Sequence, residues 1–260
     1  LIRQAFLPRF EQGRTPIRAE LLGERVYDGF RLQRIVFESF PGWQVGLDLY
    51  LPLAPGPAVP LLCPCGHGPK WLDDHQLPPQ VFARNGFAAA LFDMPMFGEK
   101  WRANDHFLQG AQAGMLGLWS NYFFLVDILR TADYLATRPD IDTAHGFGIT
   151  GVSGGGMSAI FAAGLDPRSR ALAPACCVVP FGAHLVDGLY TGCAENFLRG
   201  QAAAGLNLHY LVGLAAPLPC LVLGGTEDEL FRQPKVEAAF HEIQALYALE
   251  GVADRLQLFF

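Results

Sequence analysis

Residues 148–157 read Gly-Ile-Thr-Gly-Val-Ser-Gly-Gly-Gly-Met, where an apolar strand pattern runs through Gly-x-Ser-x-Gly into a helical pattern. A serine on such a turn stands above the edge of a sheet, provided that Gly151 and Gly155 carry no side chain. The helix that follows places its dipole and the Gly154 N–H where an oxyanion would develop. The segment therefore predicts Ser153 as the nucleophile of an acyl-transfer reaction. The plainer alternative is a glycine-rich turn whose serine only caps a helix.

A second motif overlaps this turn. Gly146, Gly148 and Gly151 have the spacing of the dinucleotide fingerprint, but that fingerprint follows a strand, and these glycines fall inside one. No acidic residue ends a strand about 20 positions later, as the fingerprint requires. We therefore predict no cofactor.

On both sides of the turn, strand and helix patterns alternate. Helices are expected at about 73–85, 118–137, 153–165 and 235–249, and strands at 59–65, 88–92, 146–150, 171–179, 220–224 and 256–260. This alternation predicts an α/β fold with a mostly parallel, twisted sheet covered by helices on both faces. Before it, 32–40 and 44–51 alternate as two strands joined at Pro41-Gly42, which predicts an antiparallel hairpin.

The remaining segments fit a single domain spanning residues 1–260. Residues 1–30 mix charged and apolar side chains without a clean period, so we expect a partly helical N-terminal extension. Residues 180–216 hold scattered glycines and no sustained period, and we expect a lid-like excursion over the sheet there.

An oxyanion site needs a second N–H donor from the loop after the strand at 59–65. Gly66-His67-Gly68 follows that strand directly. We predict the backbone N–H of His67 as the donor, with Gly68 as the second choice, because Pro69 has no N–H. The His67 ring is assigned no role, since a polar turn residue is as good an interpretation.

The acid that would orient a catalytic histidine is expected in the turn after the strand at 220–224. That turn holds three carboxylates, of which Asp228 is the best placed. Glu227 and Glu229 are interpreted as solvated neighbours, and Asp187 is the alternative acid. A merely acidic loop remains the competing interpretation.

The catalytic histidine itself is expected after the last strand, but the sequence ends at Phe260 within that strand. None of the seven histidines fits: His241 falls mid-helix, His145 precedes the strand at 146–150, and His184 and His209 belong to the lid-like segment. We therefore expect the histidine beyond Phe260. Without a base, Ser153 would be a poor nucleophile.

At these residues the chain resembles bacterial α/β-hydrolases of the acetyl xylan esterase and dienelactone hydrolase-like group. The resemblance covers about residues 55–260 and rests on the Ser153 turn together with the segments Gly66–Gly68, Asp93–Lys100, Asp133–Asp142, Leu165–Arg168 and Gly225–Phe231. Asp93–Lys100 is similar to that group's Asp-x-Pro-Gly-Phe-Gly-Glu-Arg. The resemblance implies the α/β-hydrolase fold, with Ser153 as the nucleophile and Asp228 as the acid.

Three positions depart from the group's pattern. Met96 stands where the group has Gly, Cys63-Pro64-Cys65 replaces an apolar run ending in His, and the Gly-His after the final strand is absent. Dienelactone hydrolases use a cysteine nucleophile, so Ser153 favours ester hydrolysis. The predicted substrate is acetylated carbohydrate or another short-chain ester. A serine peptidase or amidase of the same fold, and a catalytically dead binding module, are the alternatives.

Composition excludes other classes of function. A formal charge of −6 with no Lys/Arg cluster argues against a nucleic-acid partner, and no apolar run reaches the length of a membrane span. Asp73, Asp74, His75 and Asp105-His106 match no known metal spacing, so no metal is predicted. Five of the six cysteines lie in or beside apolar runs, which slightly favours a reducing cytoplasm; the chain begins with Leu1, so a removed leader keeps secretion open. The sequence leaves a homo-oligomer open.

Overall fold

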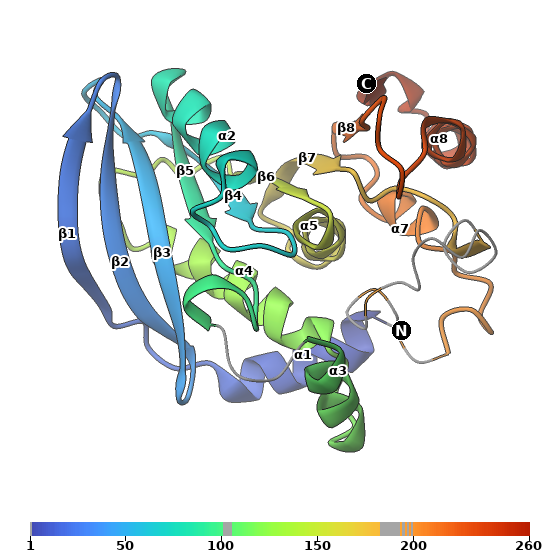
Figure 1. The fold of residues 1–260 in the computed structure, drawn as a ribbon, viewed down its shortest axis with the longest axis horizontal. Coiled ribbons are helices and arrows are strands. Elements are labelled where there is room, and N and C mark those ends of the chain that lie inside the picture. The colour runs from blue at the N-terminus through green and yellow to red at the C-terminus, as the bar shows by residue number, and fades with distance from the viewer. Residues whose placement is uncertain (1, 101–105, 183–192, 194–195, 197, 199) are drawn as a thin grey trace.

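The structure, a computed structural model, describes residues 2–100, 106–182, 193, 196, 198 and 200–260. Its centre is a nine-stranded sheet in the order β1-β2-β3-β5-β4-β6-β7-β8-β9 (Figure 1). The predicted α/β class, with a mostly parallel sheet and an N-terminal antiparallel hairpin, is confirmed.

The antiparallel part of the sheet comes first in the chain. It consists of β1 (Ala19–Tyr27), β2 (Phe30–Phe40) and β3 (Trp43–Pro52). The turn at Gly42 takes a positive φ of 77°, which glycine adopts without strain. Residues 1–30 were predicted to be partly helical; α1 (Ile2–Gly13) is a helix, but the edge strand β1 was not predicted. Every residue of β1 is exposed, so it lacks the apolar face from which strands are recognised.

The remaining six strands form the parallel part of the sheet. These are β4 (Val59–Pro64), β5 (Phe87–Phe92), β6 (Phe147–Val152), β7 (Ser169–Ala175), β8 (Cys220–Leu223) and β9 (Leu256–Phe259). All neighbours among them pair in parallel, and β5 also pairs antiparallel with β3. Their carboxyl ends therefore meet at one edge, where the loops that follow them converge.

Helices cover both faces of this sheet (Figure 1). They are α2 (Asp73–Arg84), α3 (His106–Met115), α4 (Asn121–Leu135), α5 (Gly154–Leu165), α7 (Tyr210–Gly213) and α8 (Gln233–Leu249), with short 3-10 turns η1 (Gly98–Lys100) and η3 (Ala253–Arg255). The helix expected at 118–137 is shorter, and α3 was not predicted. The strand expected at 171–179 ends at Ala175 because Cys176 has a φ of 49°, which a strand cannot contain.

Two separate cores hold these layers together. The larger one joins the sheet to α1, α4, α5 and α8, and the smaller one packs the other face against α2 through Ala83. None of the six cysteines, all of which lie in the described part of the chain, forms a disulfide, and all but Cys176 are buried, as expected of small apolar side chains. These cores hold in place the strands whose carboxyl ends carry the candidate site.

The lid-like segment predicted at 180–216 lies partly outside the described residues. In its described part, α7 packs against α5 and α8. Among the helices that the structure describes, none is long and apolar enough to cross a membrane.

Candidate active site

Ser153 occupies the sharp turn between β6 and α5. Its backbone has φ 54° and ψ −120°, a strained conformation for a residue with a side chain. A Cβ at Gly151 would lie 2.6 Å from the carbonyl carbon of Gly155, and a Cβ at Gly155 would lie 2.3 Å from the Pro64 oxygen. The predicted strained strand-to-helix turn is therefore present, with the predicted lack of space at both glycines.

The loop after β4 lies against the start of α5. A Cβ at Gly154 would meet the His67 ring at 2.6 Å. The Gly68 N–H donates to the Gly66 carbonyl at 2.8 Å, so it is already bonded within its own loop. This arrangement brings the two predicted oxyanion residues, His67 and Gly154, into contact beside Ser153.

The His67 ring also reaches the serine, which the sequence did not reveal. Its Nδ1 lies 3.4 Å from the Ser153 Oγ. Residues 67 and 153 follow different strands, and only the pairing of β4 with β6 makes those strands neighbours. The contact is at the outer limit of a hydrogen bond, and its direction depends on which ring nitrogen carries the proton.

A buried histidine supports the loop that carries His67, the predicted oxyanion residue. His75 of α2 accepts the Gly66 N–H on Nε2 at 3.0 Å, and its Nδ1 lies 3.1 Å from the Pro69 carbonyl. Because a carbonyl can only accept, the proton of His75 is on Nδ1. His75 thus binds both ends of the loop through its two ring nitrogens, which gives it a structural role.

The segment Asp93–Lys100 holds the same loop from the next strand. The buried Asp93 carboxylate accepts the Lys70 N–H at 2.6 Å and the Glu99 N–H at 2.9 Å. Burial raises the pKa of Asp93, against the lowering effect of these two N–H groups. The Lys70 ammonium donates to Glu99 at 3.0 Å. The segment is therefore a support for the loop that carries His67.

Met96 shows why a glycine is usual at its position in the related motif. It adopts a φ of 71° within the turn between Asp93 and Gly98. This left-handed conformation costs a residue with a Cβ about 1 kcal/mol or more, whereas glycine adopts it freely. The departure at Met96 is thus accommodated by backbone strain in the supporting segment.

The turn that carries the predicted acid, Asp228, follows β8 at the same edge of the sheet, and we call it the acid turn. Asp228 is partly buried, whereas Glu227 and Glu229 are exposed, which matches their interpretation as solvated neighbours. One Asp228 oxygen accepts the N–H groups of Leu230 and Phe231, each at 2.9 Å. These bonds fix the carboxylate in place. The alternative acid, Asp187, lies outside the described residues.

Cys176 connects the acid turn to the serine turn. Its thiol hydrogen-bonds to Asp228, and burial first and the Asp228 charge second raise its pKa to about 11. The residue before it, Ala175, accepts the Ser153 N–H on its carbonyl at 2.8 Å. The end of β7 thus joins Ser153 and Asp228 through adjacent residues. From the sequence, Cys176 was interpreted only as a small apolar residue.

The other predicted non-catalytic residues are scattered. His241 and His145 are exposed, His209 pairs with Glu242 at 2.9 Å, and His184 lies outside the described residues. Asp73 and Asp74 are exposed in the first turn of α2.

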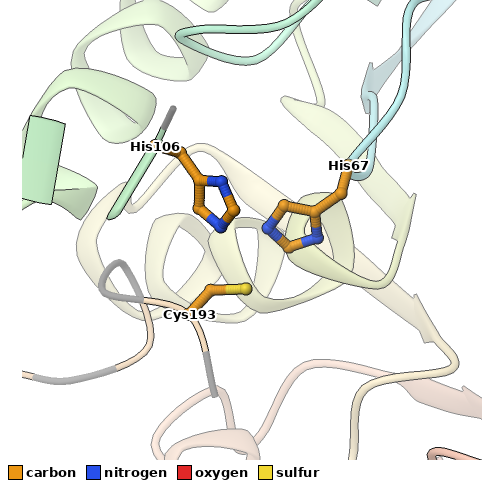
Figure 2. A group of neighbouring side chains, drawn as sticks. All are labelled: His67, His106 and Cys193. Carbon is orange, nitrogen blue, oxygen red and sulfur yellow. The ribbon is translucent and has the colours of Figure 1, made fainter. Parts of the chain in front are cut away.

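Three potential metal ligands lie together close to Ser153. They are far apart in the sequence and match no known metal-binding spacing. They are His67, His106 at the start of α3, and Cys193, whose ligand atoms all lie within 4.8 Å of one another (Figure 2). Of the pair Asp105-His106, only His106 is described. These three residues are the described group that could hold a metal ion.

The sequence and the fold are similar to those of several known proteins. No protein-family model matches the chain. YtaP of Bacillus subtilis (strain 168), whose name as a hydrolase is provisional, is 28% identical over 130 residues, covering 50% of this chain and 43% of that protein. Methylesterase BT1017 is 26% identical with a TM-score of 0.78, covering 99% of this chain and 56% of that chain. The chain thus spans about half the length of both proteins.

A more distant solved structure has the same fold. Acetyl Xylan Esterase 1 from Thermoanaerobacterium sp. JW/SL YS485 has a TM-score of 0.66 at 17% identity, covering 99% of this chain and 85% of that one. Together with the sheet order and the helices on both faces, these matches show that the chain has the α/β-hydrolase fold, in the form that acetyl xylan esterases and methylesterases share.

Proposed function

We propose that the chain carries the catalytic site of a serine carboxylic-ester hydrolase. The observation that carries this proposal is the strained turn of Ser153 at the carboxyl edge of the sheet, with glycines on both sides that admit no side chain. Such strain persists only where the surrounding structure imposes it, and it is concentrated at functional sites. An ordinary cap of α5 would not need it.

In the proposed reaction the Ser153 Oγ attacks the ester carbonyl carbon and passes its proton to a general base. The oxyanion of the tetrahedral intermediate accepts hydrogen bonds from the backbone N–H groups of His67 and Gly154. The alcohol leaves with a proton, and an acyl group remains on Ser153. A water molecule then hydrolyses this acyl-enzyme by the same route, releasing the acid.

The proposed base is a histidine that follows Phe260, oriented by Asp228. The course of β9 supports this position: it pairs with β8, and the Gly224 N–H donates to the Phe259 carbonyl at 2.9 Å beside the acid turn. Residues following Phe260 would therefore emerge at the edge that holds Asp228. Among the described residues, the alternative base is the ring of His67, which contacts Ser153.

Acetylated carbohydrate, or another short-chain ester, is the proposed substrate class. It is supported by the esterase names of the proteins with this fold, BT1017 and the acetyl xylan esterase. Fold and triad alone do not fix the leaving group. A panel of aryl acetates, acetylated xylan and aminoacyl arylamides tests the assignment. Cleavage of the esters alone supports it, and preferred cleavage of the arylamides would make the protein a peptidase or amidase.

Hydrolysis assays of the natural full-length protein distinguish an enzyme from a catalytically dead binding module. Hydrolysis that disappears in Ser153→Ala supports the enzyme. A folded full-length protein that hydrolyses no member of the panel would favour a dead hydrolase fold.

A further inference from the structure

We propose that His67, His106 and Cys193 bind one transition-metal ion of the Zn²⁺ type beside Ser153. The three residues come from the loop after β4, the start of α3 and the chain before α7, so the fold alone brings them together. Their ligand atoms all lie within 4.8 Å of one another. Figure 2 shows both rings and the sulfur directed toward a common centre.

The donor set determines the class of metal. Two imidazole nitrogens and one thiolate suit Zn²⁺ and neighbouring transition metals, whereas Mg²⁺ and Ca²⁺ prefer oxygen ligands. Tetrahedral zinc, with ligands at about 2.0–2.3 Å, would hold these atoms roughly 3.3–3.6 Å apart, so the side chains need to close by at most about 1 Å. Three protein ligands leave a fourth position for water.

The surroundings favour a bound ion over solvated side chains. Cys193 is 3% exposed, and both rings are partly buried. The centroid of the Phe97 ring lies 5.3 Å from that of the His67 ring and 5.4 Å from that of the His106 ring. Phe97 thus packs an apolar ring against both imidazoles. Binding converts the Cys193 thiol to a thiolate and releases its proton to solvent, while both imidazoles stay neutral.

The same ion would act on Ser153 through His67. Nδ1 of His67 contacts the Ser153 Oγ, and Figure 2 shows the ring nitrogen farther from the Cβ, Nε2, turned toward His106 and Cys193. A metal on Nε2 leaves the proton of a neutral imidazole on Nδ1. His67 then donates to Ser153 and cannot accept its proton. Metal binding therefore fixes the direction of the contact beside the nucleophile.

Metal uptake is the direct test and requires no catalysis. The natural full-length protein and residues 1–260 are dialysed against Zn²⁺ and analysed for bound metal, and Co²⁺ is used as a spectroscopic probe. We expect one ion per chain and a thiolate-to-cobalt charge-transfer band. Cys193→Ala and His106→Ala should each weaken binding more than about 100-fold, because losing a ligand costs more than losing an outer hydrogen bond. Cys63→Ala and His241→Ala are the matched controls and should bind as the parent does.

The proposal is overturned if the protein takes up neither ion, or if Cys193→Ala and His106→Ala bind as tightly as the controls. Circular dichroism checks that each variant folds. If Cys193→Ala does not fold, His106→Ala decides: Zn²⁺ binding as tight as that of the controls contradicts the site. Because these measurements read metal binding, their failure is distinct from failure of the esterase proposal.

Discussion

The Nδ1 atom of His67 lies 3.4 Å from the Oγ of Ser153, although the two residues are 86 positions apart. His67 thus belongs to the proposed oxyanion loop, contacts the turn of Ser153 and is one of the three proposed metal ligands. The proposals above give the backbone and the ring of His67 separate roles, which substitutions can distinguish.

Gly66→Ala tests the backbone role, because it leaves the His67 ring in the protein. A Cβ at position 66 would lie 2.6 Å from the Val152 carbonyl, so the loop must shift and the His67 N–H moves with it. We expect ester hydrolysis by the full-length protein to fall by about 10²–10³-fold, the usual cost of losing one oxyanion donor. Gly23→Ala is the control, since nothing lies within 4 Å of its Cβ. Equal rates for both variants would remove this loop from the oxyanion site.

His67→Ala tests the ring, because the backbone N–H remains. We expect Zn²⁺ binding to be lost while ester hydrolysis in metal-free buffer falls by less than about tenfold, since the proposed base is another histidine. A loss of several orders of magnitude, with the fold intact, would instead identify the His67 ring as the base.

Met96 offers a test of backbone strain in the supporting segment. Both Met96→Gly and Met96→Ala remove the same buried side chain beyond Cβ, but only glycine relieves the φ of 71°. We expect the glycine variant to unfold with a free energy about 1 kcal/mol higher than the alanine variant, the reverse of the usual order. Urea denaturation measures the difference. A more stable alanine variant would show that position 96 is not strained.

Cys176 reports on the charge of Asp228. Because burial and then the Asp228 charge raise the thiol pKa to about 11, the thiol stays protonated at pH 9 and should react slowly with iodoacetamide. Asp228→Asn removes the charge, so the pKa should fall part of the way and alkylation at pH 9 should become faster. Asp254→Asn, at an exposed position, is the control. An unchanged rate in Asp228→Asn would separate Cys176 from the acid turn.

Local patterns of apolar residues were enough to predict most of the fold. The β6–Ser153–α5 turn and the parallel strands have strong apolar runs, and they appear within a few residues of their predicted bounds. The strand β1 was missed because all of its residues are exposed. The helix α3 was missed; the residues that it buries, Gln109 and Ala113, are polar or small and form no large apolar stripe. Single residues with positive φ, such as Cys176, also end elements without a signal in the sequence.

The candidate site could be predicted only where a motif fixes the backbone. The turn of Ser153, the loop of His67 and the turn of Asp228 each follow a strand, and parallel pairing brings them to one edge. The hydrogen bond of Cys176 with Asp228 and the proximity of His106 to Cys193 depend on tertiary packing. No spacing along the chain encodes them.

Covalent labelling of Ser153 tests the central claim most directly. The natural full-length protein, its Ser153→Ala variant and residues 1–260 are incubated with an aryl fluorophosphonate, and intact mass and peptide mapping locate the adduct. We predict one adduct per full-length chain, on Ser153, with none on the Ser153→Ala variant, and loss of aryl acetate hydrolysis in step with labelling. Residues 1–260 should label far more slowly, because the proposed base follows Phe260. An adduct on another residue, or undiminished hydrolysis by Ser153→Ala, would contradict the proposal that Ser153 is the nucleophile.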